Sequence, residues 1–327
     1  MAGDTRRPAL PAFRPPPGLG GGHRQTLVPH LLRRGPAVAY RRERLDLPDG
    51  DFLDLDWIDG DDASRVAVVA HGLEGSTQRA YVRGMAAALA ADGWSVCAWN
   101  LRGCSGEPNR LLRAYHSGAT DDLDAVVRHV TARGATRIGL VGFSLGGNLT
   151  LRWLGEQGAG VPPEVVGAVG VSVPVDLAGA SRAMERGLRR VYVRHFLRKL
   201  SAKAHQKAGA FDGAPDAARA RAARTFHAFD DGFTAPIHGY ASADDYYARA
   251  SARPLLTSIA VPTLLVNALD DPFLGPSCYP SAEAAANPLL TLLTPRTGGH
   301  VGFLQRDGRY WSEDVAVRFL RAVLDRR

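Results

Sequence analysis

The stretch RIGLVGFSLGGNLTLRWLG, residues 137–155, decides the fold, because it joins an apolar run to a helical segment through a glycine-rich turn. Ser144 lies at this turn between Gly142 and Gly146, in the pattern Gly-x-Ser-x-Gly. The pattern alone is weak evidence, since a chain with 36 glycines produces such matches by accident. A buried strand before the serine and a helix directly after it are typical of a sharp turn that exposes a nucleophilic hydroxyl.

The segments around this stretch predict a doubly wound α/β sheet. Short apolar runs occur at residues 65–70, 95–100, 137–142, 165–175, 261–269 and 288–294. Helical patterns separate them near 78–92 and 120–133, directly after Ser144, and from about 312 to 327. Continuous apolar strands separated by helices indicate parallel strands covered on both faces. Alternating apolar and polar residues on either side of Pro48–Asp51 predict an antiparallel hairpin before them, so the expected sheet has eight strands.

The chain is predicted to contain an N-terminal arm, residues 1–36, and one large domain, residues 37–327. Residues 1–22 are rich in proline and glycine, which predicts an irregular conformation, and a short helix or turn is expected at 23–34. Between Val175 and Ala260 about 85 residues contain no convincing strand, too many for a plain connection. We interpret this part, at about 175–260, as a helical cap over the carboxyl edge of the sheet.

Composition excludes several classes of protein. The chain is 45% hydrophobic and 22% charged, and no apolar run is long enough to span a bilayer. The net charge of +7 comes almost wholly from scattered arginines, without the basic stripe of a nucleic-acid face, so no nucleic-acid partner is expected. The three cysteines are too few and scattered for a disulfide scaffold. No apolar signal core is present near the start, and a cytoplasmic location is expected.

Ser144 needs a base to take its proton and a carboxylate to orient that base. In open α/β sheets such groups lie at the carboxyl ends of strands. His300 follows the last predicted strand and is the expected base. Asp270 and Asp271 end the preceding strand; we prefer Asp271, which opens a turn before Pro272, and expect Asp270 to cap or satisfy the loop backbone.

Acyl chemistry at a serine also needs two backbone N–H donors for the oxyanion of the tetrahedral intermediate. Leu145 follows the serine directly and supplies the first expected donor. The loop after strand 65–70 reads AHGLEGS, and there we expect the amide of Leu73 to be the second donor, with His71 and Gly72 shaping the loop. A plain glycine-rich turn is the alternative interpretation of this loop.

Two other features have competing interpretations. Residues 182–207 are strongly basic and carry Met184, Leu188, Val191 and Leu200 at near-helical spacing, which suits weak association with an anionic membrane or attraction of acidic substrates. A cap helix with a solvated arginine face is the alternative that we favour. Cys104 lies beside the expected cleft without a histidine of its own, and we interpret it as a packing residue.

The order Ser144, Asp271, His300 is the order of α/β-hydrolases. Together with the blocks HGLEGS, WNLRGCSG, YHSGATDDL, GFSLGGN, NALDDPF and GGHVGF, it resembles the YheT-like branch of that superfamily. The resemblance spans residues 23–303. It implies the α/β-hydrolase fold, a serine carboxylic-ester hydrolase with these three residues as its triad, and no metal or organic cofactor. Short- or medium-chain acyl esters and phospholipids are the implied substrates.

Two alternatives remain open from the sequence. The same acyl-enzyme transfers its acyl group to an alcohol or thiol in an acyltransferase, and the residues do not separate this reaction from hydrolysis. A non-catalytic binding protein or a peripheral membrane module with the same fold is the other alternative. An intact triad argues against a non-catalytic protein.

Overall fold

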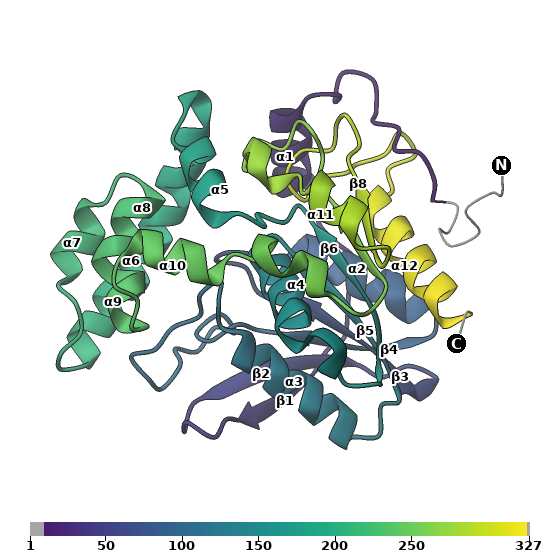
Figure 1. Ribbon diagram of the computed structural model, residues 1–327, viewed down its shortest axis with the longest axis horizontal. Helices are drawn as coiled ribbons and strands as arrows, with labels where there is room; N and C mark the ends of the chain where they lie inside the picture. Colours follow the sequence, from purple (N-terminus) through teal and green to yellow (C-terminus); the bar gives the residue numbers. More distant parts are fainter. Residues whose placement is uncertain (1–9, 326–327) are drawn as a thin grey trace.

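One eight-stranded sheet forms the centre of the computed structural model, which describes residues 10–325 (Figure 1). The strands are β1 (Arg41–Asp46), β2 (Phe52–Ile58), β3 (Asp62–Ala70), β4 (Trp94–Trp99), β5 (Arg137–Phe143), β6 (Val165–Val171), β7 (Thr263–Val266) and β8 (Leu290–Leu293). Their order in the sheet is β1-β2-β4-β3-β5-β6-β7-β8. Pairing is antiparallel for β1 with β2 and for β2 with β4, and parallel for the rest. The predicted mostly parallel sheet with an antiparallel hairpin is confirmed.

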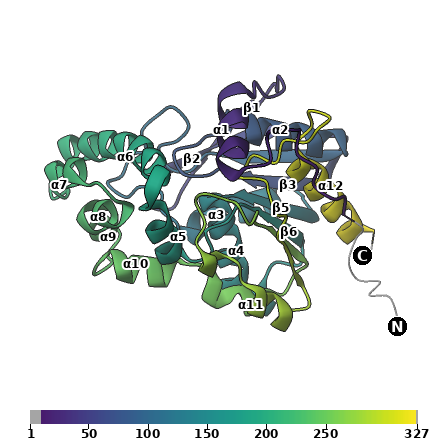
Figure 2. The same cartoon turned by 90° about the horizontal axis from the view of Figure 1, so that it is seen from above.

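Helices cover both faces of this sheet (Figures 1 and 2). The helices α2 (Ala80–Ala91) and α12 (Trp311–Leu324) lie on one face. On the other face lie α3 (Thr120–Ala132), α4 (Leu145–Gln157) and α11 (Ser281–Ala286). The residues of β4 and β6 are all buried, as expected for parallel strands between two helical layers. The closing helix predicted to residue 327 ends at Leu324, and residues 326–327 lie outside the described part.

The segment between β6 and β7 is helical and forms the cap at the left of Figure 1. It contains α5 (Leu177–Met184), α6 (Arg190–Ala210), α7 (Ala217–Ala222), α8 (Phe226–Phe229), α9 (Ala235–Ile237) and α10 (Ala243–Ala250). A small core of its own, which includes Val193, Leu197, Phe229 and Phe233, holds these helices together. The predicted helical cap insertion is therefore confirmed.

The basic segment 182–207 is not one amphipathic helix, contrary to the spacing of its apolar residues. Helix α5 ends at Met184, Gly187 adopts a left-handed conformation (φ +56°), and α6 begins at Arg190. This break separates the apolar residues, because Met184 is buried in the cap whereas Leu188 and Val191 are exposed. The glycine is the physical reason, since it adopts positive φ without steric cost.

The N-terminal segment packs on the sheet's last loop and on α12. Helix α1 (Gly22–Leu32) corresponds to the short helix predicted at 23–34. Before it, the indole N–H of Trp311 donates to the carbonyl of Pro11 (2.7 Å), and the ring of Phe13 meets that of Phe303 edge-on. Residues 1–9 of the predicted arm lie outside the described residues.

Candidate active site

Ser144 lies at a sharp turn between β5 and α4, with φ +50° and ψ −118°. Such a backbone is uncommon for a residue with a side chain and persists only where the surroundings enforce it. Close packing explains the glycines on either side. A β-carbon on Gly142 would lie 2.5 Å from the carbonyl oxygen of Gly146, and one on Gly146 would lie 2.4 Å from that of His71. The turn therefore requires glycine at both positions.

The structure brings the three residues predicted from strand ends into one hydrogen-bonded chain. The His300 Nε2 atom lies 3.0 Å from Ser144 Oγ. Its Nδ1 atom lies 2.9 Å from Asp271 Oδ2 and 3.1 Å from Oδ1. With the imidazole proton on Nδ1, His300 donates to the carboxylate and accepts from the serine hydroxyl. The Asp271 side chain is fully buried, whereas that of His300 is 10% exposed.

The two adjacent aspartates have different environments. Asp271 Oδ1 also accepts from the backbone N–H of Phe273 (2.8 Å), which fixes the carboxylate against the imidazole. Asp270 Oδ1 accepts from the backbone N–H of Gly299 (3.0 Å), and its buried Oδ2 has no partner among the described residues. Asp270 thus satisfies the loop backbone, as the sequence interpretation expected.

Helix α1 holds the histidine loop, a contact that the sequence interpretation missed. The backbone N–H of His300 donates to Thr26 Oγ1 (2.8 Å), and the buried Gln25 side chain bonds both the N–H and the carbonyl of Leu304. On the cap side, the ring of Phe273 stacks on the imidazole at 4.0 Å and 17°. The sequence interpretation placed a short helix or turn at 23–34 and assigned no chemistry to it.

The loop after β3 passes directly beside the serine. A β-carbon on Gly72 would lie 3.1 Å from Ser144 Cβ. His71 is fully buried, donates from Nδ1 to the carbonyl of Gly72 (2.7 Å) and accepts at Nε2 from the N–H of Leu101 (3.1 Å). Burial lowers the pKa of His71 to about 4, so the ring is neutral and braces the loop.

The two expected backbone donors border the same space as the serine. Leu73 follows Gly72 in this loop, and Leu145 is the first residue of α4. Both line the cavity that contains Ser144 and His300. Neither amide N–H donates to another residue within the described part of the chain, so both are free to meet an oxyanion.

A buried acid, Glu74, follows Leu73 in the loop after β3 and holds this loop in place. Glu74, at φ +52°, accepts from the hydroxyl of Tyr115 (2.6 Å) and from Lys203 Nζ (3.0 Å). The same Lys203 ammonium donates to Cys104 Sγ (3.3 Å). Burial raises the pKa of the Cys104 thiol to about 11, which keeps it protonated at neutral pH and agrees with its interpretation as a packing residue.

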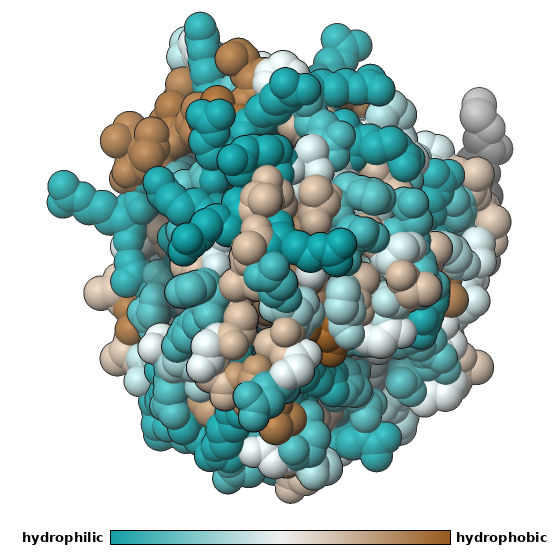
Figure 3. Space-filling model, turned by 90° about the vertical axis from the view of Figure 1, so that its left-hand side faces the viewer, coloured by the Kyte–Doolittle hydropathy of each residue, from teal (hydrophilic) through white to brown (hydrophobic). Residues whose placement is uncertain are grey.

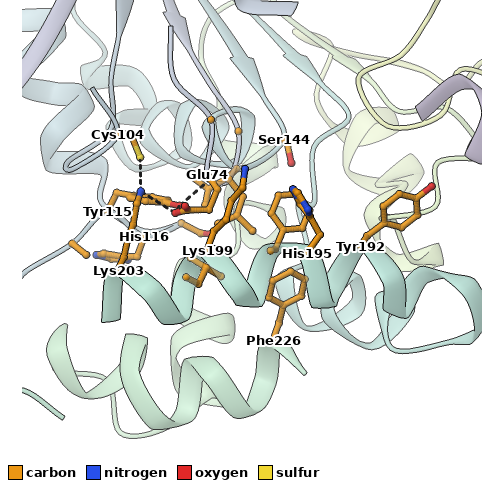
Figure 4. Close-up of a pocket in the computed structure, with 18 of the residues that line it drawn as sticks. Glu74, Cys104, Tyr115, His116, Ser144, Tyr192, His195, Lys199, Lys203 and Phe226 are labelled. Carbon is orange, nitrogen blue, oxygen red and sulfur yellow. Dashed lines mark hydrogen bonds and ion pairs between the residues drawn. The ribbon is translucent and has the colours of Figure 1, made fainter. Parts of the chain in front are cut away.

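A cavity of about 1200 Å³ lies between the sheet's loops and the cap (Figure 4). Ser144 and His300 border it on the sheet side. Its cap side is mostly apolar and includes Leu177, Met184, Phe196, Leu200, Phe226, Phe229, Phe233 and Ile237. A space of this size and lining accommodates an apolar chain attached to a reacting group at the serine.

Exposed apolar side chains lie on α1 and around the start of α6, beside this cavity. Leu31 (72% exposed) and Leu32 belong to α1, Leu188 (76% exposed) belongs to the turn between α5 and α6, and Val191 belongs to the first turn of α6. Leu31 and Val191 line the cavity as well. We call these four residues and Leu27 the apolar rim; Figure 3 shows an apolar patch at the upper left of the cap-side face.

Helices α1 and α6, which carry most of this rim, are in direct contact: the imidazole of His23 stacks on Tyr192 (5.8 Å, 7°) and bonds its hydroxyl (3.0 Å). No helix in the described part is long and apolar enough to cross a membrane. Among residues 10–325, no group of three or more His, Cys, Asp or Glu side chains is arranged to hold a metal ion.

The α/β hydrolase fold family model matches residues 67–307, and the chain belongs to this family. It is 42% identical over 298 residues to the Escherichia coli (strain K12) protein named "Putative esterase YheT", covering 89% of this chain and 87% of that protein. Human phospholipase ABHD3 is 31% identical (93% and 77% covered). Among solved structures, a Pyrococcus furiosus esterase aligns with a TM-score of 0.60 at 19% identity, covering 96% and 98%.

Proposed function

We propose that this protein hydrolyses carboxylic esters with Ser144 as nucleophile, His300 as general base and Asp271 as the carboxylate that orients the base. The continuous hydrogen-bonded chain from Ser144 Oγ to Asp271, with links of 3.0 and 2.9 Å, carries the proposal. The relatives support the reaction class, because they include proteins named as an esterase, a phospholipase and, in Saccharomyces cerevisiae, a monoacylglycerol lipase (30% identical).

In the proposed reaction Ser144 Oγ attacks the ester carbonyl while its proton passes to His300 Nε2. The carbonyl oxygen becomes an oxyanion, which the amides of Leu73 and Leu145 stabilise. As the carbonyl re-forms, the alcohol leaves with the proton from His300, and an acyl-enzyme remains on the serine. A water molecule then gives its proton to His300 and attacks the acyl group, which releases the acid and restores the serine. No cofactor enters these steps.

The acyl group is proposed to be short or medium in length, with lipid esters among the substrates. The cap side of the cavity supports an apolar chain, since it carries Phe196, Phe226, Phe229 and Phe233. Its volume of about 1200 Å³ exceeds the roughly 300–1,000 Å³ of common ligand pockets.

We propose that the protein acts in the cytoplasm, a reducing compartment, because its three cysteines are free and buried.

The test is the hydrolysis of 4-nitrophenyl esters of graded chain length together with labelling by a fluorophosphonate. Wild-type protein should hydrolyse one or more of these esters and be labelled once per chain. Replacement of Ser144 by alanine should abolish labelling and lower kcat at least ~10³-fold, with the circular dichroism spectrum unchanged. A wild type inactive on all the esters, or labelling that survives in Ser144→Ala, would refute the proposal.

We also propose weak peripheral association with anionic membranes through the apolar rim and the arginines around it. Arg34, Arg186, Arg190 and Arg194 are exposed, and none forms an ion pair with a described carboxylate. Exposed leucines and a valine among free cations suit a surface of acyl chains and anionic head groups. In this orientation the side of the cavity lined by Leu27, Leu31 and Val191 faces the lipid.

Vesicle flotation tests this association. Wild-type protein should float with phosphatidylglycerol vesicles at low salt and less with phosphatidylcholine vesicles, because the arginines contribute part of the binding. Replacing Leu188 with serine should weaken flotation, whereas Leu289→Ser, at an exposed leucine before β8, serves as the matched control. Equal flotation of Leu188→Ser and Leu289→Ser would show that the apolar rim does not contribute to membrane association.

A further inference from the structure

Lysine is confined to one helix of this protein. Among its 40 lysines and arginines, the only lysines are Lys199, Lys203 and Lys207, and all three belong to α6. Their spacing of four residues places them on one face of the helix, and all three line the cavity that contains the serine. The arginines Arg190, Arg194 and Arg198 of the same helix are exposed to solvent.

Two of the three lysines have partners within the protein. Lys203 pairs with the Glu74 carboxylate (3.0 Å), and Lys207 donates to the carbonyl oxygen of Leu111. Lys199 is partly buried and has neither a hydrogen bond nor an ion pair with any residue in the described range. Because a partly buried cation without a counter-ion is unfavourable, the position of Lys199 calls for an explanation.

A second cation faces the same part of the cavity. Arg79, at the start of α2, donates to the backbone carbonyl of Glu74 (3.0 Å) and has no carboxylate partner in the described range. Burial and then repulsion from Arg79 lower the pKa of Lys199. The nearby acid, Glu74, is already bonded to Tyr115 and Lys203.

Two imidazoles border this pair of cations. His30 of α1 and His195 of α6 line the cavity, and their rings meet edge-on at 6.4 Å. The pKa of each is lowered by burial and, among other cations, by Arg79 and Lys199. In Figure 4 the side chains of His195 and Lys199 rise from α6 toward the side of the cavity where Ser144 lies.

We propose that Lys199 and Arg79 form a subsite for an anionic group, a phosphate or a carboxylate, on the ester substrate. The inference rests on the proposed ester hydrolysis and names the class of ester. An anion between these two cations would relieve their mutual repulsion, and the partly buried setting would strengthen the attraction over that in water. The substrate is then an amphiphile, with its apolar chain against the cap and its charged group beside α6 and α2.

Two pairs of esters test the subsite. The first is 1-octanoylglycerol and its 3-phosphate, and the second is methyl octanoate and the monomethyl ester of octanedioic acid, so each pair differs by one anionic group. The variants are Lys199→Met, which keeps an unbranched side chain on α6, and Arg198→Met as the matched control, which removes a neighbouring charge that faces solvent. The quantity measured is the ratio of kcat/KM for the anionic ester to that for its neutral partner.

Lys199→Met should lower this ratio about tenfold for at least one pair, because a charge-assisted contact to the anion is lost. Arg198→Met should keep the wild-type ratio. A loss confined to the first pair identifies phosphate, and one confined to the second identifies carboxylate. Equal ratios in wild type and Lys199→Met for both pairs, or an equal loss in Arg198→Met, would overturn the subsite while ester hydrolysis stands. A wild type that hydrolyses none of the four esters would overturn the subsite, and one that is also inactive on the 4-nitrophenyl esters would overturn both proposals.

Discussion

Replacing Asp271 with asparagine should nearly abolish activity, and the hydrogen bonds of the carboxylate show why. Its Oδ1 accepts from the N–H of Phe273 (2.8 Å), and its Oδ2 accepts from His300 Nδ1 (2.9 Å). If the side-chain oxygen of the asparagine keeps accepting from the Phe273 N–H, the side-chain NH₂ lies opposite His300 Nδ1. That nitrogen must then accept, so the imidazole proton moves to Nε2, where the base can no longer accept from Ser144.

The expected loss is about 10³- to 10⁴-fold in kcat, or roughly 4–5.5 kcal/mol in the activation barrier. The adjacent Asp270→Asn is the matched control. Its Oδ1 can still accept from Gly299, and the NH₂ replaces an Oδ2 atom that has no partner, so kcat should stay within about threefold. Hydrolysis of a 4-nitrophenyl ester measures both variants, with thermal unfolding as the check on folding. An Asp271→Asn enzyme within tenfold of the wild type, or a larger loss in Asp270→Asn, would refute this reasoning.

Three other substitutions have defined outcomes. Gly146→Ala should lower the free energy of unfolding in urea by about 2 kcal/mol or more, because its methyl would lie 2.4 Å from a carbonyl oxygen; an unchanged urea midpoint would contradict this. Thr26→Val should lower kcat severalfold with KM unchanged, since the His300 N–H loses its acceptor, and Thr26→Ser should restore it; failure of serine to rescue would argue against a positioning role. Burial raises the pKa of Asp230 from 3.8 to about 6, so the folded state keeps a proton that the unfolded state loses, and stability falls as pH rises from about 4 through 6. Relative to Asp230→Asn, the wild type should therefore lose about 1–2 kcal/mol of unfolding free energy between pH 5 and pH 8; a constant difference would exclude this titration.

The sheet and the arrangement of Ser144, Asp271 and His300 could be predicted because their signals are local. The strands of the parallel part contain continuous apolar runs, and parallel strands bring their carboxyl ends to one edge, so residues directly after two such runs meet there. Strand ends were less predictable. The strand predicted at 165–175 ends at Val171, because Ser172 adopts φ +55° and its hydroxyl accepts from the N–H of Val301.

The support of the histidine could not be predicted from local patterns. Thr26 and His300 are bonded across 274 positions of sequence, and no periodicity links such distant residues. The structure explains two glycines of the histidine loop by the close approach of α1. A β-carbon on Gly302 would lie 1.9 Å from the carbonyl oxygen of Gln25, and one on Gly299 would lie 2.5 Å from that of Gly22. Glycines in the GGHVGF block thus allow α1 to approach, but the sequence alone does not say which segment they admit.

The cavity-facing side of helix α6 could not be predicted from the hydrophobic pattern, for a different reason. Its cations occur on two faces, so polarity alone does not separate the face toward the cavity from the face toward solvent; the type of cation does. Within α6 the arginines Arg190, Arg194 and Arg198 face water, whereas the lysines face the cavity. A compact ammonium on a flexible apolar stem can lie along the aromatic walls there and still reach an anion. If genomic composition alone had set the choice of cation, arginine would be expected at Lys199 as well. The three exceptions to an otherwise uniform use of arginine therefore point into the same cavity as the proposed nucleophile.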